Sequence, residues 1–211
     1  MDKDGQIIES LTGTYDSKIK VFRFMTDVNM FTDSIFIKTN TLKYESEISL
    51  ATFGSGTNAW KENNMLSSEA GWYDREKETF FFNRNVHMMS ENQEAWGDSL
   101  YFYRNTSDVI LLGNTQLTDT TRQVHSLSGK VEYIDSISRV TLTRNPAVVA
   151  ETEENGTRDT VYIGADIMYY YTKRMCDIDS LTVAEAVLRK SNLDIDPVRE
   201  FRRKAAEEAA K

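Results

Sequence analysis

The chain has 211 residues, of which 40% are hydrophobic, and it contains only two prolines and ten glycines. This composition suits one or two folded domains and excludes a disordered or collagen-like chain. The formal net charge of −8 argues against general nucleic-acid binding, which needs a basic face to displace phosphate counterions. It also argues against simple electrostatic docking on anionic membranes, and no apolar run approaches the length of a transmembrane helix.

The N-terminal residues Met1–Gln6 have neither the basic start nor the apolar stretch of a signal peptide. Two interpretations remain: a cytoplasmic protein, or a mature exported protein whose signal segment has been removed. A single cysteine cannot form an intrachain disulfide, so cysteine usage does not decide between the two.

An aromatic residue recurs at nearly regular intervals along most of the chain. The successive spacings are 29, 29, 29, 31 and 37 residues, for the anchors Tyr15, Tyr44, Tyr73, Phe102, Tyr133 and Tyr170. The last interval contains the polar stretch 151–159, which predicts an enlarged hairpin loop. A fixed period of this kind is typical of a repeat protein whose units stack on one another.

Within each period, apolar residues alternate with residues that are more often polar. The apolar columns stand two residues before each anchor and seven, nine, thirteen and fifteen residues after it. Period-two alternation predicts strands with one buried face. Twelve residues after each of the first five anchors stands an Asp, Gly or Asn, which predicts a bend or bulge because these residues tolerate unusual backbone angles: Asp27, Gly56, Asn85, Asn114 and Asn145.

The sequence therefore predicts one elongated all-β domain of stacked two-strand repeats of about 29 residues, with a short helical C-terminal tail. We place a lead-in at 1–11, the repeat domain at 12–179 and the tail at 180–211. In the tail, residues 181–190 are predicted to be helical, with Thr182 as the cap and Glu185 completing a capping box. A second helix is predicted from Asp196-Pro197 to Ala209, with proline at its first position.

The inward columns supply the candidate ligand-binding residues. Repeats of similar length do not taper, and large Phe and Met residues suit mobile acyl chains, so we expect an open interior rather than the closed core of an ordinary β-sandwich. The candidates are Phe22, Phe24, Val28, Met30, Leu42, Phe53, Phe80, Phe82, Val86, Met88, Leu100, Phe102, Val109, Leu111, Leu117, Val131, Tyr133, Val140, Leu142, Met168 and Tyr170.

Catalytic, metal and cofactor sites are not predicted. His87 is expected to point outward and His125 to lie in a polar linker, with no metal ligand at a suitable spacing. Glu69, Asp98 and Asp166 share one column, as paired carboxylates of a β-helix glycosidase or lyase would. A repeated acid at a strand start more often bonds backbone N–H groups or closes a turn, so we expect a structural role.

The pattern Gly/Asp-x-apolar-x-Tyr-Asp, followed by an alternating strand that ends in Asn-Val, resembles the OstA-like/LptA proteins of lipopolysaccharide transport. The full pattern is carried by Ser-Glu-Ala-Gly-Trp-Tyr-Asp at 68–74 and Phe-Phe-Phe-Asn-Arg-Asn-Val at 80–86. Matching half-units lie at 97–102 and 164–170, and the resemblance extends over most of residues 12–175.

The resemblance implies an open β-jelly-roll whose two sheets enclose an apolar groove for the acyl chains of lipopolysaccharide or a lipid A-like lipid. It implies a periplasmic protein that bridges toward the outer membrane, contacts other lipopolysaccharide-transport proteins through edge strands and forms head-to-tail homo-oligomers. A charged headgroup is expected near rim cations, with Lys38, Lys43, Arg84 and Arg104 as candidates.

Two other functions stay open: a structural or adhesive β-solenoid without a ligand, and a carbohydrate-active β-helix enzyme. The 151–159 insertion and the helical tail depart from short members of the family. They leave open whether the chain is the bridge itself or a domain of a larger exporter.

Overall fold

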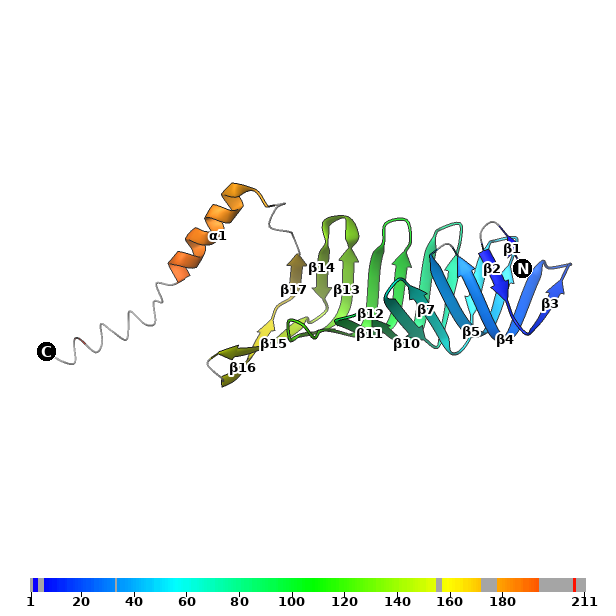
Figure 1. Ribbon diagram of the computed structural model, residues 1–211, viewed down its shortest axis with the longest axis horizontal. Coiled ribbons are helices and arrows are strands. Elements are labelled where there is room, and N and C mark those ends of the chain that lie inside the picture. Colours follow the sequence, from blue (N-terminus) through cyan, green and yellow to red (C-terminus); the bar gives the residue numbers. More distant parts are fainter. Residues whose placement is uncertain are drawn as a thin grey trace. The chain divides into compact units, whose positions relative to one another are not determined.

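The computed structural model describes residues 2–3, 6–32, 34–154, 157–171, 178–193 and 207. The chain divides into two compact units, Met1–Tyr171 and Thr172–Lys211. The first unit is a stack of β-strands, and the described part of the second is one helix, α1 (Ser180–Leu193) (Figure 1). Within the described residues, no helix has both the length and the apolar character needed to cross a membrane.

All strand pairings in the first unit are antiparallel, which confirms the predicted all-β jelly-roll. Successive strands lie along the long axis of this unit (Figure 1). They are β1 (Asp2–Lys3), β2 (Gln6–Glu9), β3 (Thr12–Asp16), β4 (Val21–Thr32), β5 (Ile35–Glu45), β6 (Leu50–Phe53), β7 (Thr57–Lys61), β8 (Asn64–Ser68), β9 (Ala70–Asp74), β10 (Thr79–Met89), β11 (Gln93–Tyr103), β12 (Asp108–Asp119), β13 (Val124–Ile134), the 3-10 turn η1 (Asp135–Ile137), β14 (Arg139–Thr143), β15 (Ala147–Glu154), β16 (Thr157–Gly164) and β17 (Ile167–Tyr171).

The long strands each belong to two layers, because their pairing changes partner halfway along. The first part of β4 pairs with β3 and its second part with β2, and β10 in the same way pairs with β9 and then β8. We call the layer that contains β3, β6, β9, β14 and β17 layer A, and the layer that contains β2, β7, β8, β15 and β16 layer B.

Bulges at the predicted column join the two layers. The ladder shifts register between Met25 and Val28, between Asn83 and Val86, and between Leu112 and Thr115. All five residues of the predicted bend column have a positive φ: Asp27 (52°), Gly56 (72°), Asn85 (51°), Asn114 (46°) and Asn145 (59°). The prediction is therefore confirmed, and the left-handed backbone there folds each long strand from one layer into the other.

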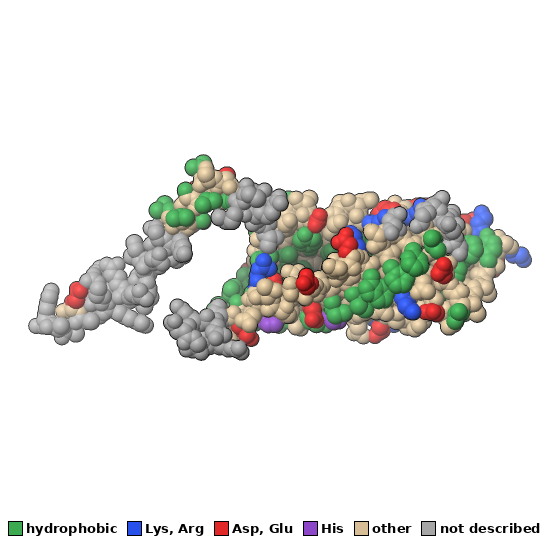
Figure 2. Space-filling view, in the orientation of Figure 1, with side chains coloured by type: hydrophobic (Ala, Val, Ile, Leu, Met, Phe, Trp, Pro, Cys, Tyr) green, Lys and Arg blue, Asp and Glu red, His purple; other side chains and the backbone are tan. Residues whose placement is uncertain are grey.

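Alternation places the inward columns in one apolar core, as predicted. Phe80 and Phe82 are buried, whereas Phe81 lies on the outer face beside Trp72, with a ring-centroid distance of 5.4 Å. On the outer face of layer B, Phe31, Phe36 and Trp60 stack in register across β4, β5 and β7. Figure 2 shows hydrophobic side chains gathered in a stripe over this part of the surface.

The structure differs from the expected boundaries at three places. Strand pairing begins before residue 12, since β2 pairs with β4 and Ile8 lies in the core. The predicted loop at 151–159 is largely strand, because β15 and β16 stay paired as far as Glu154 and Thr157. Helix α1 is capped by Asp179, whose carboxylate accepts hydrogen bonds from the Thr182 backbone N–H and hydroxyl, so the cap is not Thr182. The predicted second helix lies outside the described residues, apart from Glu207.

Two glycines provide a matched test of the bulge. Gly113 has φ +75°, and a Cβ there would lie 2.2 Å from an Asp98 carboxylate oxygen, whereas a Cβ at Gly164 would meet no atom within 4 Å. We expect Gly113→Ala to lower the free energy of unfolding by about 1–3 kcal/mol, through backbone strain and the clash. Gly164→Ala should change it by less than about 0.5 kcal/mol in urea denaturation. Equal stability of the two variants would contradict the assigned bulge.

Candidate functional site

The interior between layers A and B brings most of the predicted ligand-binding residues into one cluster. Twelve are buried: Phe24, Val28, Met30, Leu42, Phe53, Phe80, Phe82, Val86, Leu100, Leu111, Val131 and Leu142. Seven are partly buried and pack against that core: Phe22, Met88, Phe102, Val109, Leu117, Val140 and Met168. Tyr133 is also partly buried, and Tyr170 is 47% exposed.

Several interior residues were not among the candidates. Ile8, Ile35, Ile37 and Leu66 join the core from β2, β5 and β8. Their strands do alternate in burial, but they lie outside the columns that the aromatic anchors define. Local alternation was the signal that would have found them.

Burial along the interior depends on both depth and position in the stack. The interior residues nearest the bulges are buried in most of the repeats, and together they form an apolar floor. They include Val86, Leu100, Leu111 and Leu142. Nearer the hairpin edges, the column seven residues after the anchors changes along the stack. After the partly buried Phe22 at the N-terminal end of the stack, Ala51 and Phe80 are buried, whereas Val109 and Val140 are only partly buried. The interior is therefore closed in its first half and open in its second.

A polar cluster closes the hairpin edge of the first half. The Tyr73 hydroxyl donates a hydrogen bond to Glu78 Oε2 (3.0 Å), and Arg104 Nη1 donates to both this hydroxyl (3.2 Å) and Glu78 Oε2 (2.8 Å). Thr32 of layer B also interacts with this hydroxyl. Burial, reinforced by the bond to Glu78, raises the pKa of the Tyr73 hydroxyl above its ordinary value.

Lys61 marks the point where this closure ends. Its Nζ, at the end of layer B strand β7, lies 5.3 Å from the centroid of the Phe102 ring in layer A. The contact crosses the hairpin edges of the two layers and brings a cation to the surface of the apolar interior. Lys61 was not among the predicted rim cations, because its position in the repeat gave no signal of a cross-layer contact.

The four predicted rim cations lie in different places. Arg104 is at the hairpin edge, as described above. Lys38 pairs with Asp27 near a bulge, Arg84 lies within a bulge and pairs with Glu69, and Lys43 on the outer face of layer A pairs with Glu45. These three lie away from the opening, because the register places them on the outer faces or at the bulges.

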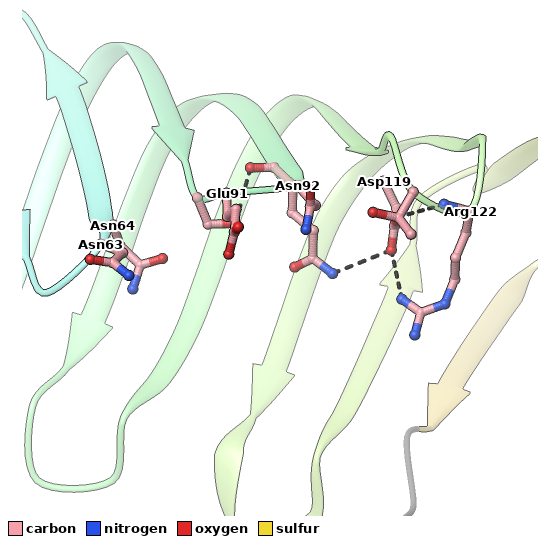
Figure 3. Close-up of a pocket in the computed structure, with 9 residues that line it drawn as sticks. Asn63, Asn64, Glu91, Asn92, Asp119 and Arg122 are labelled. Carbon is pink, nitrogen blue, oxygen red and sulfur yellow. Dashed lines mark hydrogen bonds and ion pairs between the residues drawn. The ribbon is translucent and has the colours of Figure 1, made fainter.

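A polar rim borders the open half on the layer B side (Figure 3). It surrounds a shallow hollow of about 460 Å³ whose lining includes Asn64, Gln93, Asp119 and Arg122. Arg122 Nη1 lies 2.7 Å from Asp119 Oδ2, and Gln93 donates to the same oxygen (3.4 Å). Hydrogen bonds from the Arg122 backbone and side chain lower the pKa of Asp119.

The column of carboxylates holds the bulges rather than forming a pair for catalysis. Asp98 accepts a hydrogen bond from Asn114 Nδ2 (3.0 Å), and Glu69 accepts one from Asn85. In both cases the acid stands four residues before an aromatic anchor, and its partner is the bend residue of the long strand that follows. This agrees with the structural role expected for these acids.

The two histidines make only local contacts. His87 lies on the outer face, 3.2 Å from Glu94 and stacked on Trp96. His125 belongs to β13 and bonds Thr118, so its predicted place in a linker was wrong. In the part of the chain that the structure describes, no group of three or more His, Cys, Asp or Glu residues is placed to hold a metal ion.

The fold and its interior define a β-jelly-roll protein with an apolar floor and polar hairpin edges. The family model for OstA-like protein matches residues 2–98. Over these residues the chain is similar to the OstA-like family, which confirms the resemblance found in the sequence. The comparison with curated proteins found no match.

Among solved structures, the chain is similar to LptH from Pseudomonas aeruginosa, the LptA-homologous periplasmic component of the lipopolysaccharide transport device. The two share 13% identity, with a TM-score of 0.30 over 74% of this chain and 93% of that one.

Tyr44 and Tyr73 test the closed edge because they occupy one column 29 residues apart. The Tyr44 hydroxyl is buried without a hydrogen-bond partner in the described part of the chain, whereas the Tyr73 hydroxyl bonds Glu78 and Arg104. We expect Tyr44→Phe to raise the free energy of unfolding by about 1 kcal/mol, and Tyr73→Phe to lower it by about 1 kcal/mol. Chemical denaturation of both variants measures the difference, and a Tyr44→Phe variant less stable than Tyr73→Phe would contradict this account.

Proposed function

We propose that this protein is a non-enzymatic lipid carrier of lipopolysaccharide transport, which holds acyl chains of lipopolysaccharide or a lipid A-like lipid between its two β-layers. The observation that carries the proposal is the apolar interior of an OstA-like chain, whose floor is buried through most of the stack while its edge opens to solvent in the second half. Each acyl CH₂ that leaves water for such a surface contributes about 0.8 kcal/mol.

The polar edges suit an amphipathic ligand. An acyl chain inside the interior would leave its headgroup at the hairpins, where Lys61, Arg104 and Arg122 supply positive charge beside Glu78 and Asp119. Anionic groups on the headgroup would compete with these carboxylates for the cations. A periplasmic location, with the chain bridging toward the outer membrane, is part of the same proposal.

Strand β14 offers matched variants for testing lipid binding. Val140 lies on the open wall, Leu142 lies in the buried floor, and Thr143 points to the outer face opposite Lys130. We expect Val140→Asp to fold with a loss of about 1 kcal/mol, since solvent reaches the carboxylate, and to release lipid. Leu142→Asp should lose several kcal/mol, because its carboxylate is buried without a partner. Thr143→Asp is the control and should keep both stability and lipid.

The measurement is organic extraction of the purified proteins, with mass spectrometry for bound lipid and circular dichroism for folding. Wild-type protein without copurifying lipid, and without binding of added lipopolysaccharide, would refute the carrier function. A ligand-free protein that still assembles would favour the structural β-solenoid.

We also propose head-to-tail association, with other copies or with other lipopolysaccharide-transport proteins, through edge strands. In layer A, β3 pairs with β4 and β17 with β14, and no other described strand pairs with either, so each presents an unpaired edge. Strand β17 is also rich in exposed aromatic residues, including Tyr169, Tyr170 and Tyr171. Such edges recruit further strands.

Light scattering at increasing protein concentration tests this association. We expect the average molecular mass of the full chain to rise with protein concentration. If the predicted tail helix blocks one end, the rise should appear only in a chain that lacks residues 180–211. Successive backbone N–H groups of β3 point alternately to β4 and to the free edge. Of the two variants Gly13→Pro and Thr14→Pro, one therefore removes an N–H group from the free edge, and we expect that variant to weaken association while keeping the fold. A strict monomer in the full and shortened chains would contradict the proposal.

A further inference from the structure

The side chains on the walls of the interior become more exposed to solvent from one point along the stack onward. The column fifteen residues after the anchors starts with Met30 and Ala59, which are buried, and continues with Met88, Leu117 and Val148, which are partly buried. On layer A, the column seven residues after the anchors is partly buried at Phe22, buried at Ala51 and Phe80, and again partly buried at Val109 and Val140. The layer B wall therefore opens from β10 onward and the layer A wall from β12 onward, in the second half of the stack.

The first half is filled by its own side chains. The largest fully buried residues of the core include Tyr44, Phe53, Tyr73 and Phe80, all from this half. The rings of Tyr73 and Phe80 stack with centroids 4.0 Å apart, and Phe53 lies 6.5 Å from Phe82. Interiors packed in this way have no room for a further chain without displacing side chains.

In the second half, Leu100, Leu111, Val131 and Leu142 form a buried floor, and the residues beside it on both layers, Val109, Leu117, Val140 and Val148, are only partly buried. We call this floor and its two partly exposed walls the trough. Figure 2 shows hydrophobic side chains inside a recess of this unit near β13 and β14. In layer A the trough extends over β11, β12, β13, β14 and β17, which at about 4.8 Å between strands gives roughly 19 Å.

The trough walls favour one kind of occupant. Apart from the free edge of β17, the strands that form them are paired in continuous ladders, so the backbone groups along the trough are not free to bind a peptide strand. The wall residues Val109, Leu117, Val140 and Val148 carry no polar atoms, so a sugar inside would lose its hydrogen bonds to water without replacement. An acyl chain has no such groups to satisfy.

We infer that acyl chains occupy only the second half of the interior, along the trough from Phe102 to Met168, and that the first half is a solid core that never loads. The inference rests on the proposed lipid-carrier function and adds a location to it. Lys61 over Phe102 forms the boundary, and the Gln93–Asp119–Arg122 rim lies beside the headgroup.

Methionine methyl groups report on this location in the unmodified chain. Met30 lies in the closed half, Met88 and Met168 line the trough, and Met25 and Met65 lie on outer faces. The probe is a stearic acid with a nitroxide near its methyl end, added to protein labelled with ¹³C at the methionine methyls. We expect strong attenuation of the Met88 and Met168 signals, unchanged Met30, and reversal on adding unlabelled stearic acid.

The outcomes separate the location from the function. Attenuation of Met30 equal to that of Met88 and Met168 would overturn the location and leave the lipid-carrier function standing. Attenuation confined to Met25 and Met65 would mean surface adsorption and would overturn the location. Failure of the function itself would appear separately, as the absence of lipid in the extraction of wild-type protein.

A variant that narrows the trough gives a second test. Val140→Trp adds bulk on the open wall, where the side chain still has solvent beside it. We expect the variant to fold and to bind the nitroxide probe roughly tenfold more weakly. The outer-face variant Thr143→Trp is the control and should bind as the wild type does. Unchanged binding by folded Val140→Trp would overturn the location.

Discussion

The left-handed backbone at each bulge is the constraint on which the rest of the structure depends. Thr26-Asp27, Arg84-Asn85 and Arg144-Asn145 all hold positive φ values, although none of these residues is glycine. Each such residue costs on the order of 1 kcal/mol, so the surrounding structure has to hold it in place. Without these bends, β4, β10, β11, β12 and β13 would continue as flat strands, and no interior would form between two layers.

The repeat supplies the interactions that hold the bends. The acids of one column bond the bend residues of the following long strand, as Asp98 does with Asn114. Backbone bonds such as Glu69 N to Arg84 O and Gly129 N to Arg144 O cross the same region. Because each unit holds the next, the geometry is propagated along the stack, as is typical of repeat proteins.

The closed and open halves follow from a difference in side chains rather than in backbone. Both halves have the same two layers and the same bulges. In the first half the anchors are Tyr44 and Tyr73, whose rings fill the hairpin edge and, at Tyr73, join a polar cluster. In the second half the anchor rings Phe102 and Tyr133 are only partly buried, and so are Val109 and Val140, which follow them by seven residues. The size of the wall residue alone does not close the interior, because Ala51 in the same column is smaller than either valine and is fully buried beneath the neighbouring rings.

The sequence by itself determined the repeat, the strand alternation, the bend column and the inward set, because period and parity are local properties of the chain. It thereby identified Phe80 and Phe82 as interior and Phe81 as exterior. It did not determine that Lys61 lies over Phe102, that Asp179 caps the helix, or that the interior closes in one half and opens in the other. These features depend on which side chains meet across two layers, and residues far apart in the sequence meet only once the bulges have folded the strands.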